Sequence, residues 1–285
     1  MSILSWNCQG AGNTETGRRL REMQRTFFPD FLFLMETKQK KKYVTRLQDS
    51  LGYDNCFMVD PVGLSGGLAV FWKNCYKVEV LSADNRIIDL KVNIGSMMFF
   101  LTCVYGDPVR ALRQLVWEQL SGIGIGRNEA WVVLGDFNEL MTNTEKMGGP
   151  LRNESSFWDF RNMAHNCKLA EIRSSGNWFS WAGWRDKIWI QCRLDRSFGN
   201  DEWFQLFPRA HMEYLDMWAS DHRPILITFA SEQSVNAKGR FCFDKRWLSK
   251  PGIVDVVKRG WCGGQQDIEI SLAERIGRCR SELYR

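Results

Sequence analysis

Short apolar runs, separated by turn-forming residues and a few helical stretches, are the feature that most limits the fold of this 285-residue chain. Runs rich in β-branched and aromatic residues that are this short are typical of buried strands. They cover Ile3–Trp6, Phe31–Met35, Leu68–Trp72, Lys77–Leu81, Met97–Tyr105, Trp131–Leu134 and Ile225–Phe229. Strands therefore predominate in the predicted structure.

Three stretches between these strands have the apolar spacing of helices that pack on one face. They are Glu15–Phe27, Ala111–Ile123 and Ser155–Cys167. Many strands interleaved with few helices fit two packed sheets flanked by helices better than a regularly wound parallel sheet. We therefore expect an α/β protein, a four-layer sandwich of two mixed sheets.

A change in composition near Ala230 marks the expected end of this domain. Residues 231–239 have no apolar periodicity, which is typical of a linker. The remaining segment carries Trp247, Trp261 and a helix-like end over Ile268–Leu283, too little for a core of its own. We expect one domain over residues 1–230, and over 231–285 a linker and C-terminal segment that docks or stays partly disordered.

The composition excludes several classes of protein. The cysteines number nine and form no CxxC pair, so the sequence favours neither a zinc site nor a disulfide framework, and we expect a reducing compartment. No apolar run approaches the roughly 20 residues of a membrane helix. The net charge of +5 leans only slightly toward an anionic partner.

Polar residues that can bind a metal or a phosphate recur where a predicted strand gives way to a loop. Asn7 and Glu36 follow the first two strands, and Tyr105 ends a later one. Asp136 and Asn138 follow the strand at Trp131–Leu134; because residues two apart on a strand face one way, we expect them to converge on one substrate atom. Asp221 and His222 precede the last predicted strand.

This set contains what hydrolysis of a phosphodiester requires: ligands for a cation, a group that activates water, and donors for developing negative charge. Carboxylates and amides without cysteine suit a hard cation, so Mg²⁺ is favoured over Zn²⁺, with Mn²⁺ as a substitute. Each residue taken alone is explained equally well as a turn former or cap. The ordered set carries the prediction.

The ordered set resembles the endonuclease/exonuclease/phosphatase superfamily, which includes abasic-site repair endonucleases, deoxyribonuclease I, inositol polyphosphate phosphatases and neutral sphingomyelinases. The resemblance covers residues 1 to 230 and implies a deoxyribonuclease I-like fold. It implies that Asn7 and Glu36 hold the metal, that Tyr105 contacts the phosphate, and that Asp136 activates the water.

The same resemblance assigns the remaining positions. Asn138 helps to place the water, His222 binds and polarises the phosphate, and Asp221 belongs with the metal ligands. The aspartate that orients the histidine corresponds to Asp195. One departure is Gln9, where the repair endonucleases carry an aspartate; this weakens a two-metal proposal and leaves a single-ion mechanism intact.

Several segments look closer to one branch, the endonuclease domain of plant-type non-LTR (LINE) retrotransposons. They are Gly63–Lys73, Arg193–Phe198, Ser220–Leu226 and the tail Arg240–Gly252. In those elements the tail leads to a reverse transcriptase in cis. None follows Arg285 here, so we expect an amino-terminal fragment or a derived host gene that nicks target DNA to prime reverse transcription, and nuclear residence follows from that substrate.

Two groups of residues are candidates for DNA contact. Lys38, Lys40 and Lys41 follow Glu36, although a solvated lysine-rich face explains them equally well. The second group is an aromatic stretch, expected to be loop-like, in which Trp184 and Arg185 are the candidates. Its residues Phe179 and Trp181 are expected to pack in the core.

Two other functions stay open at this point. One is a small-molecule phosphatase or phosphodiesterase of the same superfamily, which would have the same metal site but a different substrate rim. The other is an inactive retroelement-derived remnant that binds DNA. The sequence does not define a target site, an abasic-site preference or an oligomeric state.

Overall fold

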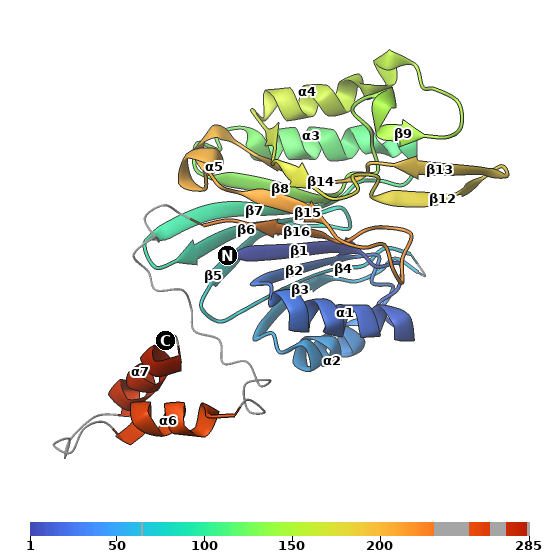
Figure 1. Cartoon of the computed structure of the whole chain (residues 1–285). Helices are drawn as coiled ribbons and strands as arrows, with labels where there is room; N and C mark the ends of the chain where they lie inside the picture. The colour runs from blue at the N-terminus through green and yellow to red at the C-terminus, as the bar shows by residue number, and fades with distance from the viewer. Residues whose placement is uncertain (64, 231–250, 263–271, 284–285) are drawn as a thin grey trace. The chain divides into compact units, whose positions relative to one another are not determined.

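The computed structural model describes residues 1–63, 65–230, 251–262 and 272–283. The chain divides into two compact units, Met1–Glu232 and Gln233–Arg285. The first unit contains two large sheets and one small sheet (Figure 1).

The first sheet has seven strands in the order β11-β15-β16-β1-β2-β4-β3. Its strands are β1 (Ser2–Asn7), β2 (Phe31–Met35), β3 (Asn55–Val59), β4 (Leu68–Trp72), β11 (Ser174–Ser175), β15 (His211–Tyr214) and β16 (Ile225–Thr228). β1 and β2 are parallel, and β16 runs antiparallel to β1. The sheet is therefore mixed.

The second sheet has six strands in the order β10-β14-β8-β7-β6-β5. Its strands are β5 (Lys77–Ala83), β6 (Ile87–Ile94), β7 (Met97–Tyr105), β8 (Trp131–Asp136), β10 (Ala170–Glu171) and β14 (Asp195–Gly199). β7 and β8 are parallel, and β14 is antiparallel to β8. A small third sheet joins β12 (Trp181–Arg185), β13 (Ile188–Cys192) and β9 (Lys146–Met147).

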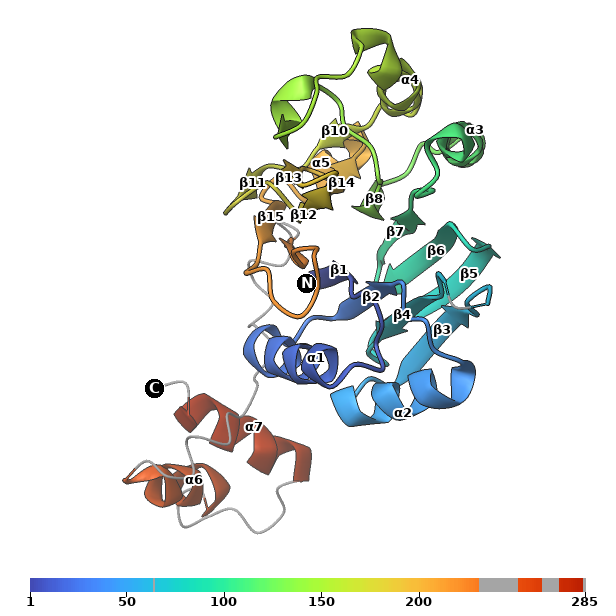
Figure 2. The same cartoon turned by 90° about the vertical axis from the view of Figure 1, so that its right-hand side faces the viewer.

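Helices cover the outer faces of both large sheets (Figure 2). The helices α1 (Thr14–Phe27) and α2 (Lys41–Leu51) share a core with the first sheet. The helices α3 (Arg113–Gly124) and α4 (Trp158–Asn166) share a core with the second. A third and central core lies between the sheets. The predicted four-layer α/β sandwich is confirmed.

Burial on both faces explains the continuous apolar runs. All residues of β2, β4 and β8 are buried, because one face of each strand packs on the other sheet and the opposite face packs on helices. All seven predicted strands form, with ends that differ by at most two residues from the predicted ones, although the outer strand β5 is largely exposed. The three predicted helices also form, and the last begins in a 3-10 turn (Glu154–Phe157).

Elements that the sequence pattern missed have charged residues or small interruptions within them. Strand β6 contains Asp89, which is buried because it accepts a hydrogen bond from the Thr102 hydroxyl and pairs with Arg127. The aromatic stretch after Trp178 was expected to be loop-like, and this was wrong: it forms the hairpin β12–β13. The short helix α5 (Asp201–Leu206), capped by Asn200, was also missed.

The second unit contains two described helices, α6 (Ile253–Cys262) and α7 (Leu272–Leu283). They pack closely at Gly260, where a Cβ atom would lie 2.5 Å from the Cα of Cys279. Part of the predicted helix-like end therefore forms, but residues 231–250, and with them Trp247 and most of the retroelement-like tail, lie outside the described residues. In the ranges that are described, no helix has the length and apolar character needed to cross a bilayer.

Candidate active site

Two parallel strand pairs bring the polar strand ends together. The pair β1–β2 is connected through α1, and the pair β7–β8 is connected through α3. Each pair therefore presents two carboxyl ends at one edge of its sheet. The two edges are in contact. The amide of Asn7, at the end of β1, donates a hydrogen bond to Asp136, at the end of β8.

Strand register sets three of the side chains side by side on the second sheet. Tyr105 on β7 is the partner of Asp136 on β8, which is in turn the partner of Asp195 on β14. Directly opposed residues point to the same face, so all three side chains lie on one side. Gly135 permits this close arrangement, because it has φ +142° and a Cβ there would lie 1.9 Å from the carbonyl oxygen of Val104.

Asn7 and Glu36 form the centre of one half of the site. The Asn7 amide nitrogen donates to Glu36 Oε1 and to Asp136 Oδ2, each at 3.0 Å. The Tyr105 hydroxyl also donates to Glu36 Oε1 at 3.0 Å, and Lys38 Nζ lies 3.0 Å from Glu36 Oε2. Burial opposes ionisation of Glu36, but these donors outweigh it and lower the carboxyl pKa.

His222 forms the centre of the other half, between two carboxylates. Its Nδ1 lies 2.8 Å from Asp195 Oδ2, and its Nε2 lies 3.7 Å from Asp136 Oδ2. Burial of the ring favours the neutral form, but the charges of Asp195 and Asp136 outweigh it and raise the pKa of His222 to about 10. The imidazole is therefore protonated at neutral pH and supplies a positive charge inside the site.

Asp136 is fully buried and connects the two halves. Burial, with the charge of Asp195 adding to it, raises the pKa of Asp136 to about 6, against the opposing effect of His222. The backbone N–H of Asn138 donates to Asp136 Oδ1 at 2.8 Å, and Asn7 holds the other oxygen. A carboxyl with a pKa close to neutrality is suited to accepting a proton from water.

Asn138 is near Asp136 for a different reason from the one expected. Strand β8 ends at Asp136, so the two residues do not share a strand face, and that argument was wrong. Instead, Asn138 has φ +53°, which turns the chain back so that its amide donates to the Gly106 carbonyl at 2.9 Å. Gln9, Glu36 and Lys38 also have positive φ, and such uncommon backbone conformations gather at functional sites.

Asp221 is held from two sides. The Trp181 indole N–H donates to Asp221 Oδ2 at 2.8 Å, whereas Oδ1 is buried and has no hydrogen-bond partner among the described residues. The neighbouring Ser220 hydroxyl donates to the backbone carbonyl of Asn7 at 2.8 Å. This bond ties the segment before β16 to the end of β1.

Comparison with known proteins identifies what this arrangement is. A family model described as the Endonuclease/Exonuclease/phosphatase family matches residues 4–222, which include every strand end described above. The chain belongs to this family. No curated protein sequence matches the chain significantly.

Solved structures of Endonuclease/Exonuclease/phosphatase proteins share the fold at low sequence identity. The endonuclease domain of TRAS1, a telomere-specific non-LTR retrotransposon, is 13% identical (TM-score 0.61), over 81% of this chain and 99% of that one. The 3'-5' exonuclease NExo from Neisseria meningitidis is 16% identical (TM-score 0.62), over 80% and 99%. The AP endonuclease LMAP from Leishmania major is 16% identical (TM-score 0.61), over 79% and 86%.

Enzymes of this family depend on a divalent metal, and two groups of side chains here offer ligands. Asp136, Asp195 and His222 have ligand atoms within 4.8 Å of one another. However, His222 Nδ1 is already bonded to Asp195 Oδ2, and the two carboxylates raise the pKa of the ring and so favour the imidazolium, which has no lone pair for a metal. The side-chain oxygens of Glu36 and Asn7, with Asp221 Oδ1, which has no hydrogen-bond partner among the described residues, fit a hard cation better.

The predicted DNA-contacting residues are all exposed. Lys40 precedes α2 and Lys41 is its first residue, and both are exposed. Trp184 is 65% exposed on β12, and the Arg185 guanidinium lies 5.0 Å from the centre of the Trp181 ring. Among these residues only Lys38 contacts a predicted metal ligand, Glu36. Of the two expected core aromatics, Trp181 is buried and Phe179 half-buried.

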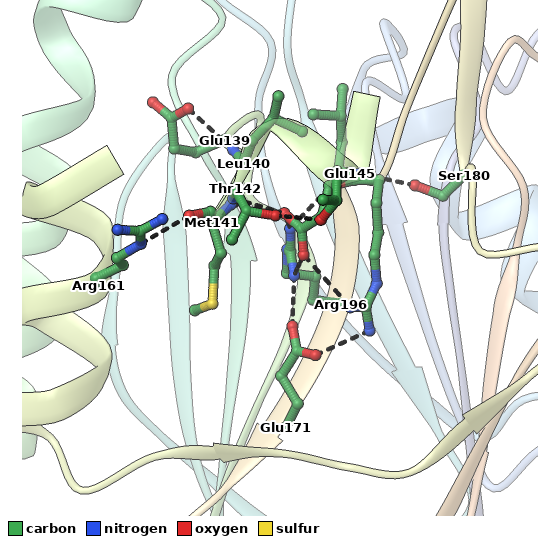
Figure 3. Close-up of polar contacts among 12 residues, drawn as sticks. Glu139, Leu140, Met141, Thr142, Glu145, Arg161, Glu171, Ser180 and Arg196 are labelled. Carbon is green, nitrogen blue, oxygen red and sulfur yellow. Dashed lines mark hydrogen bonds and ion pairs between the residues drawn. The ribbon is translucent and has the colours of Figure 1, made fainter. Parts of the chain in front are cut away.

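Sequence reasoning missed a buried ion cluster behind Asp195. The guanidinium of Arg196, which is wholly buried, bonds to Glu145 and Glu171, which lie on opposite sides of it (Figure 3). Arg193 pairs with Glu171 at 2.9 Å and donates to the Tyr214 hydroxyl at 3.0 Å. That hydroxyl donates in turn to the backbone carbonyl of Asp195 at 3.0 Å. The sequence contained one indication of this cluster, the pattern Arg193-Leu-Asp-Arg196. Arginines on both sides of a buried aspartate require acidic partners elsewhere in the chain.

Glu145→Gln is expected to lower the free energy of unfolding at pH 7 by about 3–5 kcal/mol, because it leaves the buried Arg196 without its full countercharge. Burial opposes ionisation of Glu145, but Arg196 and Arg193 outweigh it and lower the carboxyl pKa. A lowered folded pKa gives stability that is present above the unfolded value and lost as the pH falls through the folded value. The difference between variant and parent should therefore shrink in acid, as measured by urea unfolding from pH 7 to pH 3.

The matched control is Glu154→Gln, which removes the exposed partner of Arg161. It should change the free energy of unfolding by less than about 1 kcal/mol. A loss for Glu145→Gln that is equal at all pH values would contradict the account of the cluster.

Proposed function

We propose that this protein is a Mg²⁺-dependent endonuclease that nicks DNA. The observation that carries the proposal is the position of His222 between Asp195 and Asp136, at the point where Asn7 joins Asp136 to Glu36. A cationic donor, a carboxylate close to neutrality and a set of oxygen ligands are what hydrolysis of a phosphodiester requires.

The residues have distinct roles in the proposed reaction. His222 donates a hydrogen bond from Nε2 to a phosphate oxygen and stabilises the negative charge that develops there, while Asp195 fixes the ring through Nδ1. Asp136 accepts a proton from the water at a carboxylate oxygen as the water oxygen attacks the phosphorus. The P–O bond to the leaving sugar oxygen breaks, and that oxygen takes up a proton from solvent. Asn138 positions the Asp136 carboxylate through its backbone N–H. The Tyr105 hydroxyl contacts the phosphate.

The metal site in the proposal consists of Glu36, Asn7 and Asp221. A bound Mg²⁺ supplies Lewis acidity to the phosphate. The chain prepares the ligands for it: Tyr105 and Asn7 orient the Glu36 carboxylate and keep it ionised. The exposed Gln9 adds no second carboxylate beside Asn7, so the residues support a single ion.

The rim of the site supports a polymer as the substrate. The hairpin β12–β13 extends past the ends of the large sheets (Figure 1) and carries the exposed Trp184 and Trp189, whose rings are 5.3 Å apart. Exposed aromatic rings beside an arginine suit stacking on bases, and the exposed Lys40 and Lys41 suit phosphate contacts.

Two finer statements belong to the same proposal. The retroelement-like segments and the fold shared with the TRAS1 endonuclease domain support an origin in a non-LTR retrotransposon, with a reverse transcriptase in cis in related elements and action in the nucleus. A DNA substrate is further supported by NExo, which has been solved bound to a product DNA hairpin.

Asp136→Ala and His222→Ala should each slow the nicking of supercoiled plasmid in Mg²⁺ by about 10²–10⁴-fold, because they remove the proton acceptor and the cationic donor. Chelation of the metal should abolish nicking, and Mn²⁺ should restore it. The controls are Asp159→Ala and His165→Ala, which change exposed residues of α4.

Nicking that survives both substitutions would refute the assignment. Release of phosphate from inositol phosphates without any nicking would favour a small-molecule phosphatase, and DNA binding without turnover would favour an inactive remnant.

The pH dependence of kcat/KM for nicking should be bell-shaped. Asp136 acts in its ionised form, so the rate should rise as the pH increases through about 6. His222 acts in its protonated form, so the rate should fall as the pH increases through about 10. Initial rates from pH 5 to pH 11 measure both limbs, and a profile that is flat between pH 5 and pH 8 would contradict the role of Asp136.

The double substitution of Lys40 and Lys41 by alanine should weaken DNA binding and reduce the slope of log K against log salt by about 1 for each lost phosphate contact. Lys77→Ala, on the outer strand β5, is the control. Fluorescence anisotropy with a labelled duplex in chelator, at several salt concentrations, measures both. An unchanged slope would show that these lysines form only a solvated helix end.

A further inference from the structure

We propose that Trp181 is a positioning residue for the reaction: its indole N–H holds one oxygen of Asp221 and so directs the other oxygen into the site. The proposal rests on the function proposed above and adds a residue outside the catalytic set. The Trp181 ring is 8% exposed, and its Nε1 lies 2.8 Å from Asp221 Oδ2.

The two oxygens of Asp221 have different surroundings. Oδ2 accepts from Trp181, whereas Oδ1 is buried, lacks a hydrogen-bond partner among the described residues and lies 3.9 Å from His222 Nε2. A buried carboxylate oxygen without a donor is unfavourable unless something binds it. The bond to Trp181 prevents rotation of the carboxylate and leaves Oδ1 available to a cation or to its bound water.

Backbone contacts fix the indole relative to the catalytic segment. Trp181 and His222 form an antiparallel bridge, and the Ala182 N–H donates to the Asp221 carbonyl at 3.1 Å. The Arg223 N–H donates to the Ser180 carbonyl at 2.7 Å. The start of β12 and the segment that contains Asp221 and His222 therefore move as one unit.

The donor is also chemically suited to this position. An indole N–H is neutral, so it orients the carboxylate without neutralising the charge that a cation requires. The ring packs in a small core with Leu140, Phe157 and Cys192, which fixes the direction of the N–H. Three residues further along the same strand lies the exposed Trp184, so the strand that holds the donor of Asp221 continues into the exposed part of the hairpin.

Nuclear magnetic resonance of the full chain labelled with ¹⁵N in its tryptophan indoles tests the contact without any substrate. The chain has 13 tryptophans, so the Trp181 indole signal is assigned by its correlation with the backbone signals of the same residue. We expect this signal to shift in Asp221→Asn and to move with Mg²⁺ in the parent, whereas the signal of the exposed Trp158 stays in place. A Trp181 signal that responds to neither change would overturn the proposal.

Trp181→Phe tests the consequence, because phenylalanine retains an aromatic ring and removes the donor. We expect kcat for plasmid nicking to fall by about 10-fold or more, the concentration of Mg²⁺ at half-maximal rate to rise, and KM for DNA to change by less than about twofold. Trp158→Phe is the control, with parental values expected. The melting temperature of each variant separates a loss of positioning from a loss of folding.

A double-mutant cycle shows whether Trp181 acts through Asp221. In the Asp221→Asn background, Trp181→Phe should cause little further loss of kcat, whereas independent residues would have additive effects. Additive losses would refute the positioning role. So would a Trp181→Phe variant with parental activity, if Asp136→Ala abolishes nicking in the same assay. Either result would leave the proposed function standing. A parent that does not nick DNA while its Trp181 signal responds to Mg²⁺ would refute the substrate instead.

Discussion

The structure depends on one constraint: ionisable side chains are buried in the site and must stay charged there. His222 and Asp136 are almost wholly enclosed, yet the arrangement requires an ionised acid and a protonated base within 4 Å of each other. A charge in such a position persists only when every neighbour compensates for it. Asp195 stabilises the imidazolium, and Asn7 donates to the oxygen of Asp136 that faces the imidazole. The two sheets meet where these compensating groups can come from both.

The residues around the site are also charged, buried and paired. Asp195 sits in front of a cluster in which Arg193 and Arg196 alternate with Glu145 and Glu171, so the charges behind the site are also paired. Tyr214 connects that cluster to the backbone of Asp195. Such buried clusters are rigid because removal of any one member leaves an unpaired charge. Rigidity behind the site is what a reaction that depends on fixed donors requires.

The hairpin β12–β13 forms part of the rim of the candidate site. Its base is bonded to the segment that contains Asp221 and His222, and its end presents aromatic side chains to solvent. A fold shared with NExo, an exonuclease and 3' phosphatase, and with the AP endonuclease LMAP does not by itself select among substrates, because function resides in the site and not in the fold. Under the proposed function, the exposed tryptophans and lysines at the rim are the groups on which selection of a polymer depends.

The sequence by itself determined the layers and supplied the candidate residues of the site. Runs such as Phe31–Met35 read as strands because burial on both faces leaves only apolar residues, and polar residues at the strand ends are visible without any contact information. Tertiary structure alone decided the protonation of His222, the pairing of Arg196 with Glu145, and the hydrogen bond from Trp181 to Asp221. Each of these joins segments separated by 27 to 86 residues in the chain, as His222 is from Asp195 and from Asp136. The order of residues within one segment cannot reveal these three features. A pKa or a hydrogen bond depends on which residue of a distant segment the folded sheets bring into contact.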